Sequence, residues 1–438
     1  MSLKKIIVFI LFLIVHCTLK IEDCVSQWSH RNYGTTINFT CVSVVSNNTV
    51  WASGYVGTTQ KIIKTTNSGL SWSEVVSPSS GNGYLYSVVE GIDANTALVG
   101  INGIASERKV YRTTNGGANW TPVLSFTNFV DGIKMRNTTT GFVVCDPYNG
   151  KYEIFRTTNG GIIWDSTGIN VSQDGLETGE YNSLFVNDNY FCFGTSGGRI
   201  CISTNSGSSW AKHTVDYLFD LGPIWFADNG PDYAGNSYYL YISTNNGVNW
   251  NTLGNNGTGA VTGVRAYGNF CWVSRAQVLY YTSNHGSSWI KQDSSMTYNH
   301  MDAYYYSQIF YIWAVGNSGN IITVSVPVIG IKNISTEIPY KFSLKQNYPN
   351  PFNPMTKIKF EIPSDVKREM SNVKFVIYDI LGKEISTLVN EALQPGTYEV
   401  TFEGSNLPSG IYFYQLRVED PTGRTGGFVE TRKLILLK

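Results

Sequence analysis

Charge is scarce in this chain of 438 residues. Only 15% of the residues are Asp, Glu, Lys or Arg, and 32 basic residues balance 32 acidic ones, so the formal net charge is zero. A protein that binds nucleic acid through its phosphates needs a basic surface, which this composition does not supply. The sequence therefore predicts no nucleic-acid partner.

Motifs for metal binding and catalysis are also lacking. No Cys-x-x-Cys pair and no histidine pair has the spacing of zinc ligands. No serine or cysteine nucleophile can be placed with a histidine and an acid from the sequence. We therefore predict no metal, no cofactor and no catalytic residue, and the sequence favours a binding protein over an enzyme.

Long apolar runs are absent except at the N-terminus. Residues 6–15 are all apolar and follow Lys4 and Lys5, which is typical of a secretory signal peptide and short for a membrane span. We place the signal peptide at 1–17, with residue 23 as the latest cleavage point. An acylated Cys17 is the alternative. The mature chain is then predicted to be exported, with no transmembrane segment.

Cysteine is sparse as well, with seven in the chain. An exported protein can oxidise its cysteines. The segment FCFGTSGGRICIS (191–203) reads as a hairpin, and a turn at 195–198 would place Cys192 opposite Cys201. The sequence thus offers a Cys192–Cys201 disulfide, with two buried free thiols as the alternative.

Glycine and aromatic residues, in contrast, are abundant, and many of them recur in one repeated phrase. Six segments fit Ser/Thr-x-Asn-x-Gly-x-x-Trp, and their tryptophans are spaced by about 43 residues on average. The Asn, Gly and Trp residues of these boxes are Asn67, Gly69, Trp72, Asn115, Gly117, Trp120, Asn159, Gly161, Trp164, Asn205, Gly207, Trp210, Asn245, Gly247, Trp250, Asn284, Gly286 and Trp289. A period of 40–50 residues with several short strands is typical of propeller blades.

Each repeat is predicted to contain four strands, with the box as the turn between the third and the fourth. Asn and Gly suit left-handed turn positions, a Ser or Thr hydroxyl can bond across the turn, and the Trp can pack the turn onto its blade. Trp28 lies one period before Trp72. We therefore predict that residues 25–31 close a seventh blade whose inner strands are near 301–326. The expected fold is all-β, with a seven-bladed β-propeller over 25–326.

The template resembles the Asp-box, or BNR repeat, of sialidases and of propellers similar to the photosystem II assembly factor. Here the Asp is replaced by Asn in all six boxes. The resemblance implies that the boxes are structural turns at the blade periphery, not active sites. Sialidases also need three arginines at the central face, the first in Arg-Ile-Pro. Arg31, the earliest candidate, stands in HRNYG, so the resemblance does not extend to that activity.

The composition changes after residue 326. We expect a linker over 327–341 and a small immunoglobulin-like β-sandwich over 342–438. NYPNPFNP, IYDILGKEI, PSGIYFYQL and the terminal KLILLK resemble the C-terminal sorting domain of type IX secretion cargo. This resemblance implies export from a gram-negative bacterium by the type IX machinery, to the medium or the outer cell surface. It also implies that Gly410, Tyr412 and Lys438 belong to the recognised motif.

Aromatic residues give the remaining functional indication. The segment 299–313 is dense in tyrosine, and Trp225, Trp272 and Trp313 fall in segments interpreted as second strands. Such rings can bind a glycan or a protein at a propeller face. The sequence therefore predicts a secreted binding protein. The alternatives are a glycoside hydrolase, which would need converging carboxylates with raised pKa values, and an assembly scaffold with a broad apolar patch.

Overall fold

The computed structural model describes residues 28–34, 36–78, 87–102, 108–227, 230–254, 256–306, 309–327, 331–335, 338–363, 371–393, 395–404, 407–419 and 427–438. The predicted signal peptide, Cys17 and Cys24 lie outside these residues. All regular structure in the described part is β-strand, so the predicted all-β fold is confirmed. The described chain also includes no helix that is long and apolar enough to cross a membrane.

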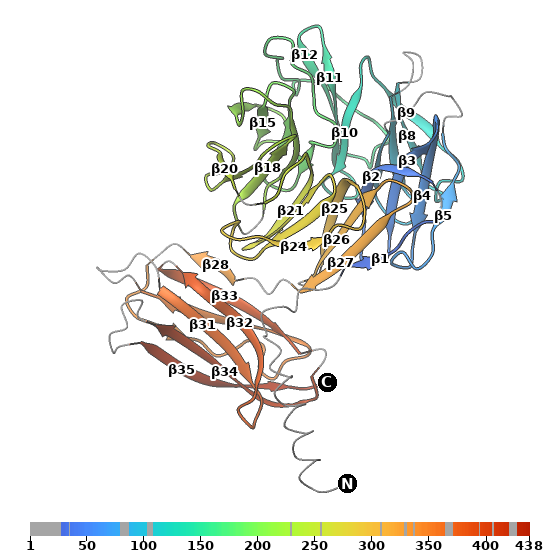
Figure 1. Cartoon of the computed structure of the whole chain (residues 1–438). Helices are drawn as coiled ribbons and strands as arrows, with labels where there is room; N and C mark the ends of the chain where they lie inside the picture. Colours follow the sequence, from blue (N-terminus) through green and yellow to red (C-terminus); the bar gives the residue numbers. More distant parts are fainter. Residues whose placement is uncertain are drawn as a thin grey trace, which may run out of the picture.

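Seven antiparallel sheets make up the first domain, and we number them as blades in chain order (Figure 1). Blade one contains β2 (Asn38–Val44), β3 (Val50–Val56), β4 (Thr59–Thr65) and β5 (Ser73–Val75). Blade two contains β6 (Ser87–Gly91), β7 (Ala97–Ile101), β8 (Lys109–Thr113) and β9 (Thr121–Ser125). Blade three contains β10 (Val130–Met135), β11 (Gly141–Tyr148) and β12 (Lys151–Thr157). Blade four contains β13 (Phe185–Val186), β14 (Phe191–Gly194), β15 (Arg199–Ser203) and β16 (Ala211–Thr214). Seven sheets are consistent with the predicted seven blades.

Blades five, six and seven complete this domain. Blade five contains β17 (Leu221–Trp225), β18 (Asp232–Asn236), β19 (Leu240–Ser243) and β20 (Asn251–Leu253). Blade six contains β21 (Val261–Tyr267), β22 (Phe270–Arg275), β23 (Val278–Thr282) and β24 (Ile290–Asp293). Blade seven contains β25 (Tyr298–Tyr306), β26 (Ile309–Gly316), β27 (Ile321–Pro327) and β1 (Ser29–His30). Four strands were expected in every unit, and this is wrong for blade three. After its box, Asp165 meets Arg156 only in an isolated bridge, so no fourth strand forms.

The first described strand closes the ring of blades. β1 pairs with β27, with Ser29 opposite Thr323, and Trp28 is buried among the side chains of blades six and seven. The innermost strand of blade one, β2, contacts β25 of blade seven and β6 of blade two. The two ends of the propeller sequence are therefore joined in one sheet, and the edge of β27 is covered.

The six boxes adopt one turn geometry. In the first box, the Thr65 hydroxyl oxygen accepts a hydrogen bond from the Gly69 N–H at 3.0 Å. The Asn67 side-chain oxygen accepts from the Thr65 hydroxyl and from the Ser71 N–H, each at 2.9 Å. The same three bonds recur in the other five boxes. All acceptors in this turn are neutral oxygens, which explains how Asn can stand where the related boxes have Asp.

The box tryptophans also connect neighbouring blades, which the sequence analysis did not foresee. Trp120 Nε1 donates to the carbonyl oxygen of Val76, which follows the last strand of blade one, at 2.7 Å. Trp72 Nε1 donates to the carbonyl oxygen of Arg31, just after the closing strand, at 2.8 Å. In two other boxes the indole bonds within its own turn. The spacing of the boxes therefore serves packing between blades as well as the local turn.

Box glycines are expected to tolerate no side chain, and Gly117 tests this. Its φ is +88°, and a methyl group there would lie 2.7 Å from Val75 Cβ of the preceding blade. Gly150 has a φ of +76° but open space around it, so Gly150→Ala is a matched control. Chemical denaturation should show a loss of about 1–2 kcal/mol for the control. Gly117→Ala should lose about 1–3 kcal/mol more. Equal losses would mean that contact between blades does not constrain the box.

The predicted Cys192–Cys201 disulfide is wrong. Both thiols are free and buried. In the β14–β15 hairpin Cys192 pairs with Ile202, and Phe193 pairs with Cys201. Successive residues of a strand face opposite sides of the sheet, so Cys192 packs toward blade five and Cys201 toward blade three. A register displaced by one residue from the predicted one thus separates the two sulfur atoms.

Two four-stranded sheets form the second domain, in the orders β28-β33-β30-β29 and β32-β31-β34-β35. Their bounds are β28 (Ile331–Ser335), β29 (Ser343–Leu344), β30 (Met355–Ile362), β31 (Ser371–Tyr378), β32 (Glu384–Leu393), β33 (Gly396–Glu403), β34 (Gly410–Glu419) and β35 (Phe428–Leu436). Alternate residues such as Phe360, Phe375 and Tyr414 form one core. The predicted linker is wrong over 331–335, because β28 pairs with β33 and belongs to this sandwich.

The three residues assigned to the sorting motif lie at one end of the β34–β35 pair. Gly410 is opposite Leu436. Tyr412 is buried, and its hydroxyl donates to the carbonyl oxygen of Pro408 at 2.8 Å. The Lys438 N–H donates to the Ser409 hydroxyl at 2.9 Å. The end of the chain is therefore fixed against the start of β34.

Candidate functional site

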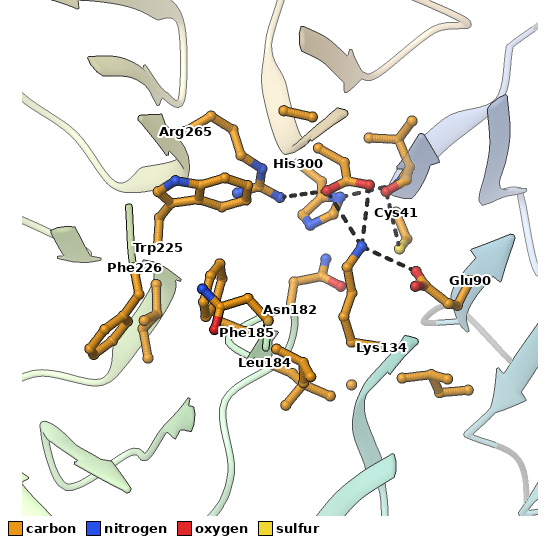
Figure 2. A pocket seen from close by; sticks show the side chains of 18 of the residues that line it. Cys41, Glu90, Lys134, Asn182, Leu184, Phe185, Trp225, Phe226, Arg265 and His300 are labelled. Carbon is orange, nitrogen blue, oxygen red and sulfur yellow. Dashed lines mark hydrogen bonds and ion pairs between the residues drawn. The ribbon is translucent and has the colours of Figure 1, made fainter. Parts of the chain in front are cut away.

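A cavity of about 210 Å³ lies on the propeller axis, and we call it the cup. Residues of all seven innermost strands line it, from β2, β6, β10, β13, β17, β21 and β25. Figure 2 shows that its two sides differ: Trp225, Phe226 and Phe185 lie on one side, while Lys134 extends toward Glu90 on the other. The cup therefore combines an aromatic wall with a charged one.

Four ionised side chains on four different blades form the charged wall, which we call the charged cluster. Lys134 Nζ lies 3.2 Å from Glu90 Oε2 and 3.3 Å from Asp302 Oδ2. Arg265 Nη2 lies 3.3 Å from Asp302 Oδ1. Two cations thus meet two carboxylates, and the cluster carries no net charge.

Every carboxylate oxygen of the charged cluster accepts a hydrogen bond. The Ser43 hydroxyl donates to Glu90 Oε2 at 3.0 Å, and the Met135 N–H donates to Glu90 Oε1 at 2.9 Å. The Val44 N–H donates to Asp302 Oδ2 at 2.8 Å, while Arg265 occupies Oδ1. Groups held in this way are fixed in place, because moving them would leave buried polar atoms without partners.

The electrostatics follow from burial and pairing. Burial raises the pKa of Glu90, and the Lys134 ammonium only partly opposes this rise. Burial alone would raise the pKa of Asp302 too, but Lys134 and Arg265 hold it below its ordinary value. Burial lowers the pKa of His300 to about 3. His300 is therefore neutral, consistent with its Nδ1 accepting the Val42 N–H at 3.1 Å.

Lys134 is the member of the charged cluster that faces the open cavity. Its side chain is 28% exposed, whereas those of Glu90 and Asp302 are 6% and 3% exposed. An ammonium group has three N–H donors, and two carboxylates occupy part of this capacity. Lys134 can therefore donate a hydrogen bond to a group that enters the cup.

Aromatic rings form the other wall and the rim, and Arg265 joins the two walls. The Arg265 guanidinium lies over the Trp225 ring at 4.8 Å, and the Trp225 indole N–H donates to the carbonyl oxygen of Ala266 at 2.7 Å. Tyr267 and Tyr305 stack with ring centroids 4.7 Å apart. The sequence analysis placed Trp225 in a second strand, which is wrong: it ends β17, the innermost strand of blade five. This position is why its ring reaches the cup.

Residues 177–183, which we call the floor segment, border the cup through Asn182, which lines it. They lie between β12 of blade three and β13 of blade four. The Asn182 side-chain amide donates to the carbonyl oxygen of Thr40 on β2 at 2.8 Å. The Tyr181 hydroxyl lies 3.4 Å from Thr40 Oγ1. Because blades one and four are far apart in the ring, these bonds cross the propeller axis, and Asn182 lines the cavity.

Most residues singled out from the sequence lie elsewhere. No box residue lines the cup, and Arg265 is the only arginine among its described lining residues, so the described part of the chain shows no triad of arginines there. Sequence reasoning missed the charged cluster. A signal was present: Ser43, Glu90 and Lys134 each stand two residues before the residue that begins the inner hairpin turn. Aligning the inner strands of the repeats would have brought these positions together.

Comparison with known proteins adds two findings. Residues 346–425 match the family model of the secretion system C-terminal sorting domain. No curated protein matches the chain in sequence.

Solved structures resemble the propeller in fold. One, titled YCF48 bound to D1 peptide, is 15% identical, covers 68% of this chain and 96% of its own, and has a TM-score of 0.53. YCF48 from Cyanidioschyzon merolae is 14% identical, covers 68% and 98%, and has a TM-score of 0.51. At this identity the likeness shows the fold alone.

The sorting domain indicates delivery to the cell surface of a bacterium of the Bacteroidetes, which confirms the predicted localisation. The chain is an extracellular β-propeller-like protein that carries a type IX secretion sorting domain.

Proposed function

We propose that this protein binds an uncharged, ring-bearing group of an extracellular protein or glycan in the cup, without catalysing a reaction. The observation that carries the proposal is the pairing of an aromatic wall with a charged cluster of zero net charge. The protein would act at the cell surface as a recognition module.

The aromatic wall favours a flat, partly apolar ligand group. Trp225 is held by Arg265 on its ring and by an edge contact with Phe310, whose centroid is 6.1 Å away. The Tyr267–Tyr305 pair stands at the rim, with Tyr305 41% exposed. Rigid aromatic groups of this kind provide contact area at low entropic cost for an aromatic side chain or the apolar face of a sugar.

The charged cluster favours a neutral ligand over an ionised one. An anion near Lys134 would also approach Glu90 and Asp302, and a cation would meet Arg265 and Lys134. A carbonyl or hydroxyl oxygen can instead accept the remaining N–H of Lys134 without disturbing the pairs. A peptide segment is the first class to consider, because the YCF48 structure of similar fold is titled as bound to a peptide.

A glycoside hydrolase is the second candidate function. Glu90 and Asp302 both line the cup and have pKa values shifted in opposite directions, as an acid and its partner carboxylate require. Against this, hydrogen bonds already occupy all four of their oxygens, and Lys134 stands between them. A carboxyl group fastened in this way has no oxygen directed at a glycosidic bond, so binding is the better supported function.

Two further roles are proposed on the sequence resemblance. The boxes would act as structural turns that maintain the blades, and Gly410, Tyr412 and Lys438 would be read by the type IX secretion machinery. Their positions at the blade periphery and at one end of the second domain agree with both roles. An assembly scaffold remains the third alternative for the propeller, and it would be recognised by protein partners that bind outside the cup.

Binding can be tested with peptide and glycan arrays probed with the full-length protein. A Tyr305→Ala variant should lose about tenfold or more in affinity for any ligand held by the rim. Tyr217→Ala removes the same type of side chain from an exposed position that does not line the cup, and this variant should bind as the parent does. Equal loss in both variants, or no loss in either, would place the binding surface elsewhere. Turnover of an arrayed glycan would favour the hydrolase.

A further inference from the structure

One backbone hydrogen bond joins the floor segment to blade three, while bonds from Thr178 and Glu180 join it to blade four. The Asn182 N–H donates to the carbonyl oxygen of Asp131 at 2.9 Å, and Asn182 has a left-handed φ of 58°. Asp131 occupies a bulge of β10 between Val130 and Gly132. A displacement of this segment from Asp131 would therefore break a bond that positions Asn182, which lines the cup.

The side chain of Asp131 lies directly against the floor segment. It is 6% exposed, and its Oδ2 atom is buried without a hydrogen-bond partner. A methyl group on Gly179 would lie 2.0 Å from this oxygen. Only glycine permits this approach. The carboxyl oxygen of Asp131 therefore lies against the Gly179 backbone and accepts no hydrogen bond. Burying such an oxygen in ionised form costs free energy.

Two more carboxyl groups surround the same glycine. Asp146 Oδ1 on β11 accepts the Gly179 N–H at 3.0 Å, and Glu180 is the next residue of the floor segment. The other titratable or charged groups that interact with these three are Cys145, Tyr152, Arg108 and Asp220. The described residues contain no group of three or more His, Cys, Asp or Glu that could hold a metal ion. Protons are thus the available means of neutralising this site.

The directions of the pKa shifts agree with that geometry. Burial, then Asp146 and Glu180, raise the pKa of Asp131 well above its ordinary value. Burial, then Asp220 and Asp146, raise the pKa of Glu180 to about 7. Burial also raises the pKa of Asp146, although the Gly179 N–H and Arg108 oppose this. The closed arrangement therefore binds protons that an open one would release.

We propose that Asp131, Asp146 and Glu180 form a proton-dependent closure of the cup, which holds the floor segment while they are protonated and loosens it as the pH rises. Glu180 belongs to the floor segment, whereas Asp131 and Asp146 are fixed in blade three. Ionisation creates like charges in a poorly hydrated site, and moving the segment away from blade three relieves the repulsion. The cup then opens beside Asn182.

Amide hydrogen exchange of the full-length protein tests this closure. Protection factors of the amides in 178–183, corrected for the intrinsic effect of pH on exchange, should fall with rising pH. Stability from a raised carboxyl pKa is complete below about pH 4 and is lost as the pH rises through the folded value. Between about pH 5 and pH 7 the expected fall is therefore roughly tenfold per pH unit for each coupled proton.

Isosteric variants separate the closure from general destabilisation. The slope of the logarithm of the protection factor against pH gives the number of coupled protons. Asp131→Asn should reduce this number by about one, and Glu180→Gln should reduce it by a similar amount. The variant with both changes should keep only the slope that Asp146 contributes. Asp188→Asn, which alters an exposed carboxylate in the hairpin of blade four, should keep the parent slope. Protection of the parent that does not change with pH, or a slope as steep in the doubly substituted variant as in the parent, would overturn the proposal.

Discussion

Replacing Lys134 with Met is expected to lower the free energy of unfolding by about 3–5 kcal/mol at neutral pH, because it leaves two buried carboxylates without their shared cation. Glu90 and Asp302 are 6% and 3% exposed and lie 3.2 and 3.3 Å from the ammonium nitrogen. Met keeps most of the side-chain volume, so the loss of unfolding free energy comes from the missing charge and not from a cavity. Chemical denaturation of the variant and the parent measures it.

The loss should depend on pH in a definite direction. Without Lys134, the pKa of Glu90 rises further and the pKa of Asp302 rises from its lowered value. The folded variant then takes up protons that the unfolded chain does not hold. Stability gained in this way is present at low pH and is lost as pH rises. The difference between variant and parent should therefore be smaller near pH 5 than near pH 8. A difference that does not vary with pH would contradict the assignment of the loss to unpaired carboxylates.

Two controls isolate the charged cluster. Lys61→Met breaks the Lys61–Glu74 pair, whose side chains are 29% and 39% exposed, and should cost at most about 1 kcal/mol. Combining Glu90→Gln with Lys134→Met removes the carboxylate that has lost its cation, since Asp302 keeps Arg265, and should recover part of the stability. If the second change gives no recovery, the two side chains do not act as a unit.

The parts of the fold that could be predicted are those encoded locally. A Thr or Ser, an Asn and a Gly at fixed offsets form a complete hydrogen-bonded turn among themselves, as Thr65, Asn67 and Gly69 show. Such a turn needs no information from the rest of the chain. Its repetition at blade spacing, together with the sorting motifs, is why the all-β class and the localisation could be predicted from the sequence.

The cup could not be derived because its contacts are distant in sequence. Asp302 of blade seven contacts Val44 of the adjoining blade one and Lys134 of blade three, and neither partner is near it in the chain. The floor segment likewise reads as an acidic loop, yet Glu177 within it is buried and lies 2.8 Å from Arg199. Strand register could not be derived either. The observed register differs by one residue from the predicted one, and this difference places Cys192 and Cys201 on opposite faces of the sheet.

Removing the second domain should abolish surface delivery entirely. A chain that ends before β28, at residue 330, lacks the segment 346–425 that matches the sorting-domain family. It also lacks all eight strands of the sandwich, so no half-sheet is left exposed. We expect this variant to accumulate in the periplasm of a type IX-competent host, while the parent reaches the surface. Cell fractionation and protease accessibility of intact cells measure the difference.

Removing only residues 428–438 tests the sorting motif within the second domain. This deletion takes away β35 and Lys438, exposes the edge of β34 and removes Leu434 and Leu436 from the core. Delivery should again fail, whereas Gly150→Ala, a substitution in the propeller surrounded by open space, should be delivered normally. Because β34 keeps Gly410 and Tyr412 in the truncated chain, surface delivery of this variant would show that those two residues suffice without Lys438. Periplasmic retention of both truncated chains, with a normally melting propeller, would instead place the export signal in the assembled β34–β35 end.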